Sequence, residues 1–215
     1  MRDVIERVEV RVKELFSGDA TGHDWWHVKQ VRDMALRIAQ AEGGDVELVE
    51  LAALSHDMGD RKFFESEDAG REMTRKTLAE CGVPADLLEK VLDIAQRVSF
   101  KGAASVDDMP TLEGKIVQDA DRLYALGAIG IARAFAYGGA KNRPMYDPET
   151  DAVLTKSGEE YYTKPSSSTI HHFYEKLLLL KDRMHTDTAK KIAEGRHEFM
   201  ETFLKRFMDE WDAKD

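Results

Sequence analysis

Apolar residues recur at every third or fourth position along most of the chain, which is the spacing of amphipathic helices. We find no convincing run of the strict alternation that marks a half-buried strand. The pattern therefore predicts an all-α protein. Three helices are expected in the first 60 residues. The first contains Val4 and Leu15, the second contains Val31 and Ile38 and ends near Gly43, and the third runs from Val46 to the "MGD" of 58–60. Further helices are expected at about 66–81, 84–98, 111–137, 167–184 and 187–212.

A long segment from Tyr137 to Ser168 interrupts the helical pattern. It contains glycines, three prolines and scattered aromatic residues, and loops of this length in compact domains are often functional. We expect residues 138–168 to form a lid over a binding site, in which "DAVLT" (151–155) could form one arm of a small hairpin. The 215 residues suit a single domain with a core at about 20–135, this lid, and C-terminal helices at 169–213.

Composition narrows the classes of function. A formal charge of −10 gives no overall attraction to nucleic acids or anionic membranes, so an anionic ligand would need local cations or a metal. The single cysteine, Cys81, excludes an intrachain disulfide and fits a reducing compartment. No apolar run is long enough for a signal peptide or a membrane span. We therefore expect a cytoplasmic protein that binds neither nucleic acid nor membrane.

The stretch "TGHDWWHVKQV" (21–31) places two histidines and an acid at the start of the second predicted helix. His27 leads the apolar stripe of Val31 and Ile38, so it is predicted to point into the bundle. In a purely structural interpretation, Thr21 or Asp24 caps the helix and His27 is a buried histidine bonded to a neighbour. In a functional interpretation, Asp24 orients the ring of His27.

The stretch "ALSHDMGDRKF" (53–63) supplies a second group of candidates. His56 shares an apolar face with Val49 and Ala53, and Asp57 follows it at a helix end, where the backbone turns and adjacent side chains can converge. An imidazole and a carboxylate turned inward together are costly to bury unless they are paired or bind a cation. A His–Asp hydrogen bond that ends the helix and a divalent metal site are therefore the two alternatives.

A third candidate lies in the predicted helix 111–137. Asp121 follows Val117 by four residues and precedes Tyr124 by three, so it sits on an otherwise apolar face. A buried carboxylate in the middle of a helix is rare without a partner. Asp119 competes with it but lies off that face.

The three stretches together place four inward-facing residues on three helical segments: His27, His56, Asp57 and Asp121. Two imidazoles and two carboxylates suit Mn, Fe, Co, Ni or Zn better than Ca, and contain too much imidazole for a typical Mg site. The residue types therefore favour a site for a divalent transition metal.

This H…HD…D arrangement resembles the HD-domain superfamily of metal-dependent phosphohydrolases. The blocks "GHDWWHVKQV", "HDMGDRKF", "QDADRLYALGAIGIARAFAYGG" and "HHFYEKLLLLKDRM" are similar to a bacterial single-domain subgroup, and the likeness covers nearly the whole chain. The resemblance implies an all-helical HD-domain bundle with a central metal held by His27, His56, Asp57 and Asp121. It also implies nucleotide hydrolysis, and some members cleave nucleoside triphosphates to a monophosphate and pyrophosphate.

Two departures from the pattern bear on the number of metals. Tyr124 stands where a second acid is expected, and Arg97 and Val98 stand where many relatives carry a histidine. HD proteins with two metals use additional histidines in this region, so we expect one metal.

Catalytic roles are assigned to residues near the second stretch. Asp57 would bind the metal and lie beside the attacking water, and Asp60 could orient that water or accept its proton. Asp60 could equally be a capping acid at the helix end. Lys62 could hold a phosphate oxygen or be a solvated lysine.

Further candidates for substrate binding are spread along the chain. Lys115 and Arg122 lie on the helix of the last metal ligand and could hold the outer phosphates, although Arg122 could instead pair with a carboxylate. His23 could face the substrate or lie exposed in its loop. His172 and Lys176 begin the helix after the lid, and their i, i+4 spacing could turn both toward the site.

Other functions stay open beside nucleoside triphosphate cleavage. A nucleotide phosphomonoesterase or phosphodiesterase would use the same residues. An HD-type metal oxidase would need a second metal and more inward histidines, whereas a non-catalytic nucleotide sensor would not need an intact ligand set. For the assembly, a homodimer is the first expectation.

Overall fold

The computed structural model describes residues 1–17, 24–59, 66–98, 108–153 and 166–214. Every regular element within these ranges is a helix, which confirms the predicted all-α class. The chain divides into two compact units. The described residues of the first lie within Met1–Ser99 and Asp108–Asp121, and those of the second lie within Arg122–Asp215. Among the described helices, none has both the length and the hydropathy needed to cross a membrane.

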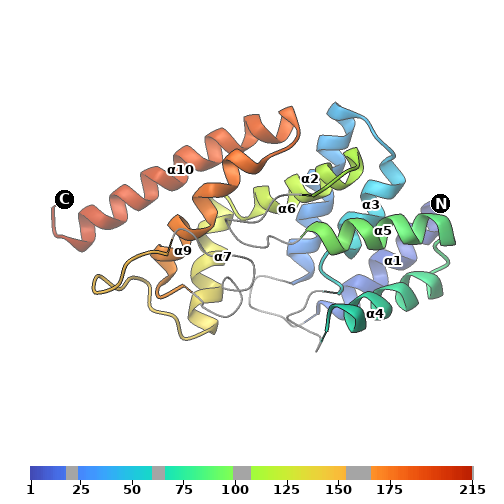
Figure 1. Cartoon of the computed structure of the whole chain (residues 1–215), viewed down its shortest axis with the longest axis horizontal. Helices are drawn as coiled ribbons and strands as arrows, with labels where there is room; N and C mark the ends of the chain where they lie inside the picture. The colour runs from blue at the N-terminus through green and yellow to red at the C-terminus, as the bar shows by residue number, and fades with distance from the viewer. Residues whose placement is uncertain (18–23, 60–65, 99–107, 154–165, 215) are drawn as a thin grey trace. The chain divides into compact units, whose positions relative to one another are not determined.

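The first unit is built around the helices that the apolar stripes predict. They are α1 (Arg2–Leu15), α2 (Trp25–Glu42), α3 (Val46–Ser55), α4 (Glu67–Glu80), α5 (Ala85–Val98) and α6 (Leu112–Tyr124), of which α6 continues past Asp121 into the second unit. Helices α2 and α3 pack side by side (Figure 1), and Val31 and Ile38 of α2 and Leu51 of α3 are fully buried. Burying one such aliphatic side chain contributes about 1.5–3 kcal/mol, and this packing fixes the two helices that carry the histidines.

A buried ion pair also joins α2 to α3. The Nε atom of Arg32 donates to Oε1 of Glu50 at 2.8 Å, and Glu50 is only 5% exposed. From α1, Arg2 lies 3.4 Å from the same carboxylate and Glu9 lies 3.3 Å from the Arg32 guanidinium. A buried charge pair is tolerated when each partner is bonded, so these contacts fasten three helices at one point.

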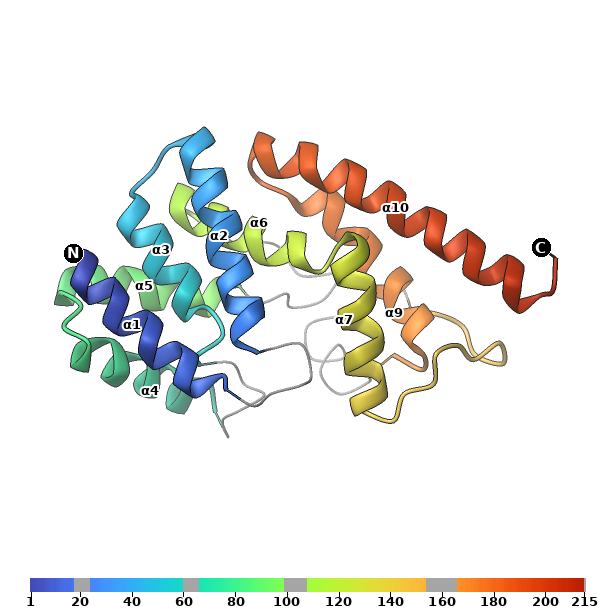
Figure 2. The same ribbon diagram turned by 180° about the vertical axis from the view of Figure 1, so that it is seen from behind.

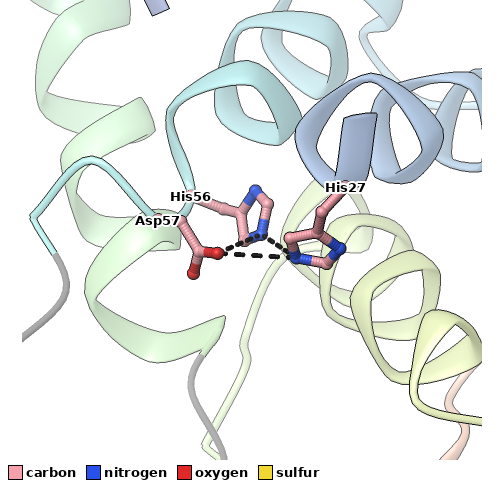
Figure 3. Close-up of side chains that lie close together, drawn as sticks. All are labelled: His27, His56 and Asp57. Atoms are coloured by element: carbon pink, nitrogen blue, oxygen red, sulfur yellow. Dashed lines mark hydrogen bonds and ion pairs between the residues drawn. The ribbon is translucent and has the colours of Figure 1, made fainter. Parts of the chain in front are cut away.

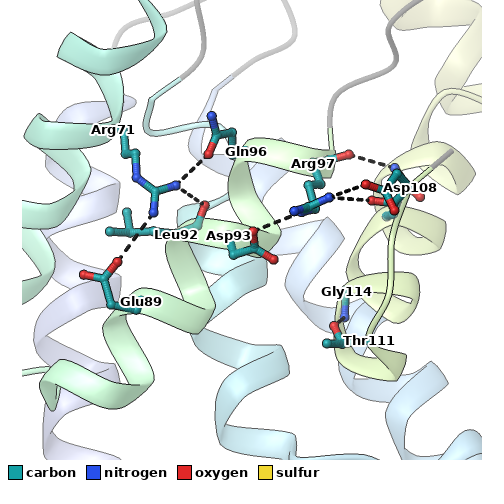
Figure 4. A network of polar contacts seen from close by, with 10 residues as sticks. Arg71, Glu89, Leu92, Asp93, Gln96, Arg97, Asp108, Thr111 and Gly114 are labelled. Atoms are coloured by element: carbon teal, nitrogen blue, oxygen red, sulfur yellow. Dashed lines mark hydrogen bonds and ion pairs between the residues drawn. The ribbon is translucent and has the colours of Figure 1, made fainter. Parts of the chain in front are cut away.

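Surface polar contacts join α5 to its neighbours (Figure 4). From α4, Arg71 donates to the side chain of Gln96 at 2.6 Å. Arg97 bonds Asp93 within α5 at 3.0 Å and Asp108, ahead of α6, at 2.6 Å. Exposed ion pairs contribute little stability, so these contacts join α5 to α4 and to Asp108 without adding much to the free energy of unfolding.

The second unit contains α7 (Gly127–Ala140), α9 (Thr169–Glu175), the 3₁₀-helix η1 (Leu177–Arg183) and α10 (Asp187–Trp211), as Figure 2 shows. The single helix predicted over 111–137 is wrong, because α6 ends at Tyr124 and α7 begins at Gly127. Gly127 has φ +72°, which glycine adopts readily, and Leu126 before it is extended.

The single helix predicted over 167–184 is also wrong. Lys176 has φ −138° and ψ −60°, and it separates the short α9 from η1. The prediction for 187–212 is confirmed by α10.

The irregular segment that we predict to be a lid starts later than expected, because α7 continues to Ala140. Residues 141–153 and 166–168 contain no helix or strand, and 154–165 lie outside the described residues. The predicted hairpin arm is not formed at 151–153, and its last two residues fall in the undescribed part. Two backbone bonds tie this segment to α9, from Thr169 N to the Pro144 carbonyl and from Ile170 N to the Met145 carbonyl, both at 2.9 Å.

An aromatic cluster joins three helices of the second unit around the fully buried Phe173. Phe135 of α7, Phe173 of α9, and Phe203 and Phe207 of α10 have neighbouring ring centroids 6.0–6.4 Å apart. Arg196 of α10 donates to the carbonyl of Leu123. These contacts hold α10 against the helices that precede it in the chain.

Candidate metal centre

Three ligand-type side chains converge in the first unit, as Figure 3 shows. His27 lies in the first turn of α2, His56 is the residue at which α3 ends, and Asp57 follows in the next turn. They are 3%, 4% and 8% exposed. One ligand atom from each lies within 4.8 Å of the other two. Because the side chains come from separate elements, the cluster depends on the packing of α2 against α3.

Asp121 of α6 approaches the same two imidazoles. Its Oδ1 atom is 3.5 Å from Nε2 of His27 and 3.8 Å from Nε2 of His56, and its side chain is 29% exposed. Burial acts to raise the pKa of this carboxyl, but the hydrogen bond to His27 and the charges of both histidines outweigh burial and hold the pKa well below its usual range. Asp121 is therefore an ionised group at the open side of the cluster.

The ring of His56 has a defined tautomer. Its Nδ1 atom is 2.8 Å from the carbonyl oxygen of Ala53, and a carbonyl can only accept, so Nδ1 carries the proton. In the neutral ring, Nε2 then has a lone pair, which is the form in which histidine binds a metal. That lone pair faces Nε2 of His27 at 3.3 Å.

The spacing of the ligand atoms fits one ion. Asp57 Oδ2 is 3.4 Å from Nε2 of His27 and 3.5 Å from Nε2 of His56, close to the 3.3 Å between the two nitrogens. Two nitrogens bound to one ion at about 2.1 Å lie roughly 3.0–3.4 Å apart. A buried set of two imidazoles and a carboxylate at these separations suggests metal binding.

The start of α2 explains how His27 is placed. The Oδ1 atom of Asp24 accepts the backbone N–H of His27 at 3.0 Å, so Asp24 is the N-cap of the helix. This confirms the capping alternative for Asp24. The tryptophans that follow have different surroundings, since Trp25 is buried and Trp26 is 63% exposed.

Helix α6 is closely surrounded at Asp119. This acid is fully buried, and because it stands two residues from Asp121, about 200° around the helix, the two acids lie on opposite sides of α6. Residues 116 to 120 are all buried, so this part of α6 has no solvated side. Lys115 on the same helix is partly exposed.

The other substrate-binding candidates lie in the second unit or outside the description. Arg122 is 3% exposed and donates to the carbonyl of Arg183. His172 is partly exposed, with Nδ1 3.3 Å from Oγ of Ser166. Lys176 is the residue at which α9 ends, and its N–H donates to the carbonyl of His172 at 3.0 Å. His23, Asp60 and Lys62 lie outside the described residues.

Sequence reasoning missed two backbone features of the centre. One is the Ala53 carbonyl behind His56, which no side-chain pattern could reveal. The other is a close approach of Gly59 to Gly70. A glycine within a helix is destabilising, so Gly70 could have been suspected of a packing role.

Comparison with known proteins agrees with this geometry. The HD domain model matches residues 25–126, which include all four of the predicted ligands. YpgQ of Bacillus subtilis (strain 168) is 38% identical over 202 residues, which are 94% of this chain and 90% of YpgQ. The chain belongs to the HD domain family.

Solved structures share the fold along nearly the whole chain. A crystal structure of a protein from Lactobacillus plantarum has a TM-score of 0.89 at 33% identity, with 99% of each chain covered. An HD-superfamily hydrolase from Bacillus thuringiensis has a TM-score of 0.75 at 44% identity, with 99% of this chain and 98% of the hydrolase covered. The crystal structure of YpgQ in complex with ADP has a TM-score of 0.76 at 34% identity, with 98% and 100% covered.

Proposed function

We propose that this HD domain protein is a metal-dependent phosphohydrolase that cleaves nucleoside triphosphates to a monophosphate and pyrophosphate. The observation that carries the proposal is the convergence of His27, His56, Asp57 and Asp121 at distances of 3.3–3.8 Å. A nucleotide substrate is supported by the ADP complex of the relative YpgQ. The family resemblance supports hydrolysis.

The four clustered side chains would hold one divalent transition metal from the set Mn, Co, Ni, Fe and Zn. When bound, the metal supplies a Lewis acid that lowers the pKa of water and neutralises phosphate charge. The oxygen of water forms a bond to the α-phosphorus, and the bond from that phosphorus to the bridging oxygen breaks. Asp57 or Asp60 accepts the proton of the water.

The choice of the bond between the α- and β-phosphates depends on cations for the departing charge. Pyrophosphate leaves with several negative charges, which must be held in the transition state. We assign this role to Lys62, Lys115 and Lys176, with His172 and His23 as further contacts. The guanidinium of Arg122 already bonds the Arg183 carbonyl, so we assign Arg122 to support of the fold.

The test is product analysis with purified protein that has been stripped of metal and reloaded with one metal at a time. A nucleoside triphosphate is digested in ¹⁸O-water, and phosphate and pyrophosphate are measured separately. We expect monophosphate and pyrophosphate in equal amounts, with ¹⁸O in the monophosphate. Asp57→Ala should abolish activity and most metal binding, whereas Asp33→Ala, an exposed acid on α2, should preserve both.

Each alternative function has its own outcome in this experiment. Diphosphate with free phosphate, or activity on monophosphates alone, would replace the proposal with a phosphomonoesterase or phosphodiesterase function. Two irons per chain with oxygen consumption would indicate an oxidase. Tight binding of the triphosphate without turnover in any metal would indicate a sensor. Full metal stoichiometry in Asp57→Ala would show that the ligand assignment is wrong.

A further inference from the structure

Two glycines bring the backbone after Asp57 into direct contact with α4. Gly59 lies two residues beyond Asp57, and Gly70 lies one turn into α4. A Cβ atom on Gly70 would be 2.4 Å from the Gly59 carbonyl oxygen, and a Cβ on Gly59 would be 2.9 Å from the Gly70 carbonyl oxygen. Side-chain carbons do not approach carbonyl oxygens so closely, so either methyl group would force the two backbones apart.

The requirement for glycine here is one of space. Neither residue has the positive φ that favours glycine at Gly43, Gly44, Gly82 and Gly127. In contrast, a Cβ atom on Gly195 in α10 would have no neighbouring atom within 4 Å, so a methyl group there meets open space. The clash at Gly59 and Gly70 is with backbone, which cannot rotate away as a flexible side chain can.

The surface of α4 at this contact is itself fixed. Thr74 is 2% exposed, and its hydroxyl donates to the Gly70 carbonyl at 2.9 Å. The same hydroxyl oxygen would be 3.1 Å from a Cβ on Gly59. The turn after Asp57 therefore rests on a rigid and closely fitting part of α4.

Asp57 depends on this support more than the two histidines do. His27 lies within the hydrogen-bonded first turn of α2, and the ring of His56 is held by the Ala53 carbonyl. Asp57 lies beyond the end of α3, where the next backbone bond runs from Met58 N to the Ser55 carbonyl. The position of its carboxylate is thus set by what packs against the turn.

We propose that Gly59 and Gly70 are positioning residues for Asp57. The close backbone contact that these two glycines allow, because neither has a Cβ atom, sets the metal affinity of the centre. The inference rests on the proposed metal site but not on which phosphate bond is cleaved. A methyl group at Gly70 would displace the turn and carry the Asp57 carboxylate away from the two Nε2 atoms. Loss of support for a ligand typically weakens metal binding about 10- to 100-fold.

The test compares Gly70→Ala with the matched control Gly195→Ala. The dissociation constant of Mn²⁺ alone is measured by calorimetry and by electron paramagnetic resonance, and the melting temperature is measured with chelator present. We expect Gly70→Ala to bind Mn²⁺ about 10- to 100-fold more weakly than the unaltered protein. Gly195→Ala should bind Mn²⁺ with unaltered affinity.

A milder pair of variants keeps the proposal testable if Gly70→Ala does not fold. Thr74→Val removes the hydroxyl that fixes Gly70, whereas Thr74→Ser keeps it, so only Thr74→Val should weaken Mn²⁺ binding. A lower melting temperature with unchanged Mn²⁺ affinity in Gly70→Ala or Thr74→Val would overturn the proposal. Failure of the protein without substitutions to bind Mn²⁺ would also overturn it. Mn²⁺ binding without nucleotide hydrolysis would refute only the proposed function.

Discussion

Two acids on α6 share a helix but have different surroundings. The carboxylate of Asp121 lies 3.5 Å and 3.8 Å from the Nε2 atoms of His27 and His56. Asp119 is fully buried, whereas the side chain of Asp121 is 29% exposed. Burying a carboxylate is costly unless it is bonded. We therefore assign Asp121 to the metal and Asp119 to the fold.

The two assignments predict opposite effects of the same substitution. Asp121→Asn should weaken Mn²⁺ binding at least about tenfold. Asp119→Asn should lower the free energy of unfolding by about 1–3 kcal/mol because it disturbs a buried bonded group, and it should leave Mn²⁺ affinity unaltered. Calorimetry and urea denaturation measure the two quantities. The reverse order of effects would make Asp119 the ligand.

The contrast between these acids shows what the sequence reveals at the scale of residues. The apolar stripe of α2 places His27 on an inward face because the same helix also has exposed positions, such as Trp26 and Asp33. Around Asp119 the helix is buried on all sides, so periodicity carries no information there. The proton on Nδ1 of His56 was also beyond prediction, because its partner is a backbone carbonyl.

Helix ends position the centre at the scale of elements. Asp24 caps α2 through the N–H of His27, and Asp45 caps α3 through the N–H groups of Glu47 and Leu48. Both caps satisfy donors that the helix itself leaves unbonded. Only the first cap involves a predicted metal ligand.

The two caps can therefore be compared directly, because both stabilise a helix but only Asp24 bonds a predicted metal ligand. Asp24→Ala and Asp45→Ala should each lower the free energy of unfolding by about 1 kcal/mol. Because fraying of the first turn of α2 moves His27, Asp24→Ala should also weaken Mn²⁺ binding several-fold. Asp45→Ala should leave that affinity unaltered. Equal Mn²⁺ affinities in the two variants would show that the cap does not position His27.

Helix existence was predictable from sequence, but two of the breaks between helices were not. The apolar pattern continues through 111–137, yet the chain turns at Gly127, whose positive φ depends on tertiary packing. A Cβ atom on Gly127 would lie 3.1 Å from the Cγ atom of Arg196 in α10. A contact between residues so far apart in the chain leaves no trace in the local periodicity.

At the scale of the whole molecule, the division into two units falls inside one helix. The boundary lies between Asp121 and Arg122 of α6. All four predicted metal ligands belong to the first unit. Helix formation is cooperative along consecutive residues, so unfolding of either unit would disturb the end of α6 that the other unit contains. This continuity supports the expectation of a single domain.

A single domain predicts one unfolding transition for both units. The three tryptophans are Trp25 and Trp26 in the first unit and Trp211 in the second. In a Trp211→Phe variant fluorescence reports the first unit, and in a Trp25→Phe/Trp26→Phe variant it reports the second. In each variant, we expect the urea midpoint measured by fluorescence to coincide with the midpoint measured by circular dichroism.

Addition of metal makes this comparison decisive. An ion that binds only the native state stabilises it by about 2.7 kcal/mol when its free concentration is about 100 times its dissociation constant. If the chain unfolds as one domain, Mn²⁺ should raise the midpoint equally for both probes, although every predicted ligand lies in the first unit. A shift confined to Trp25 and Trp26 would show that the two units unfold separately, and the unit boundary between Asp121 and Arg122 would then be a domain border.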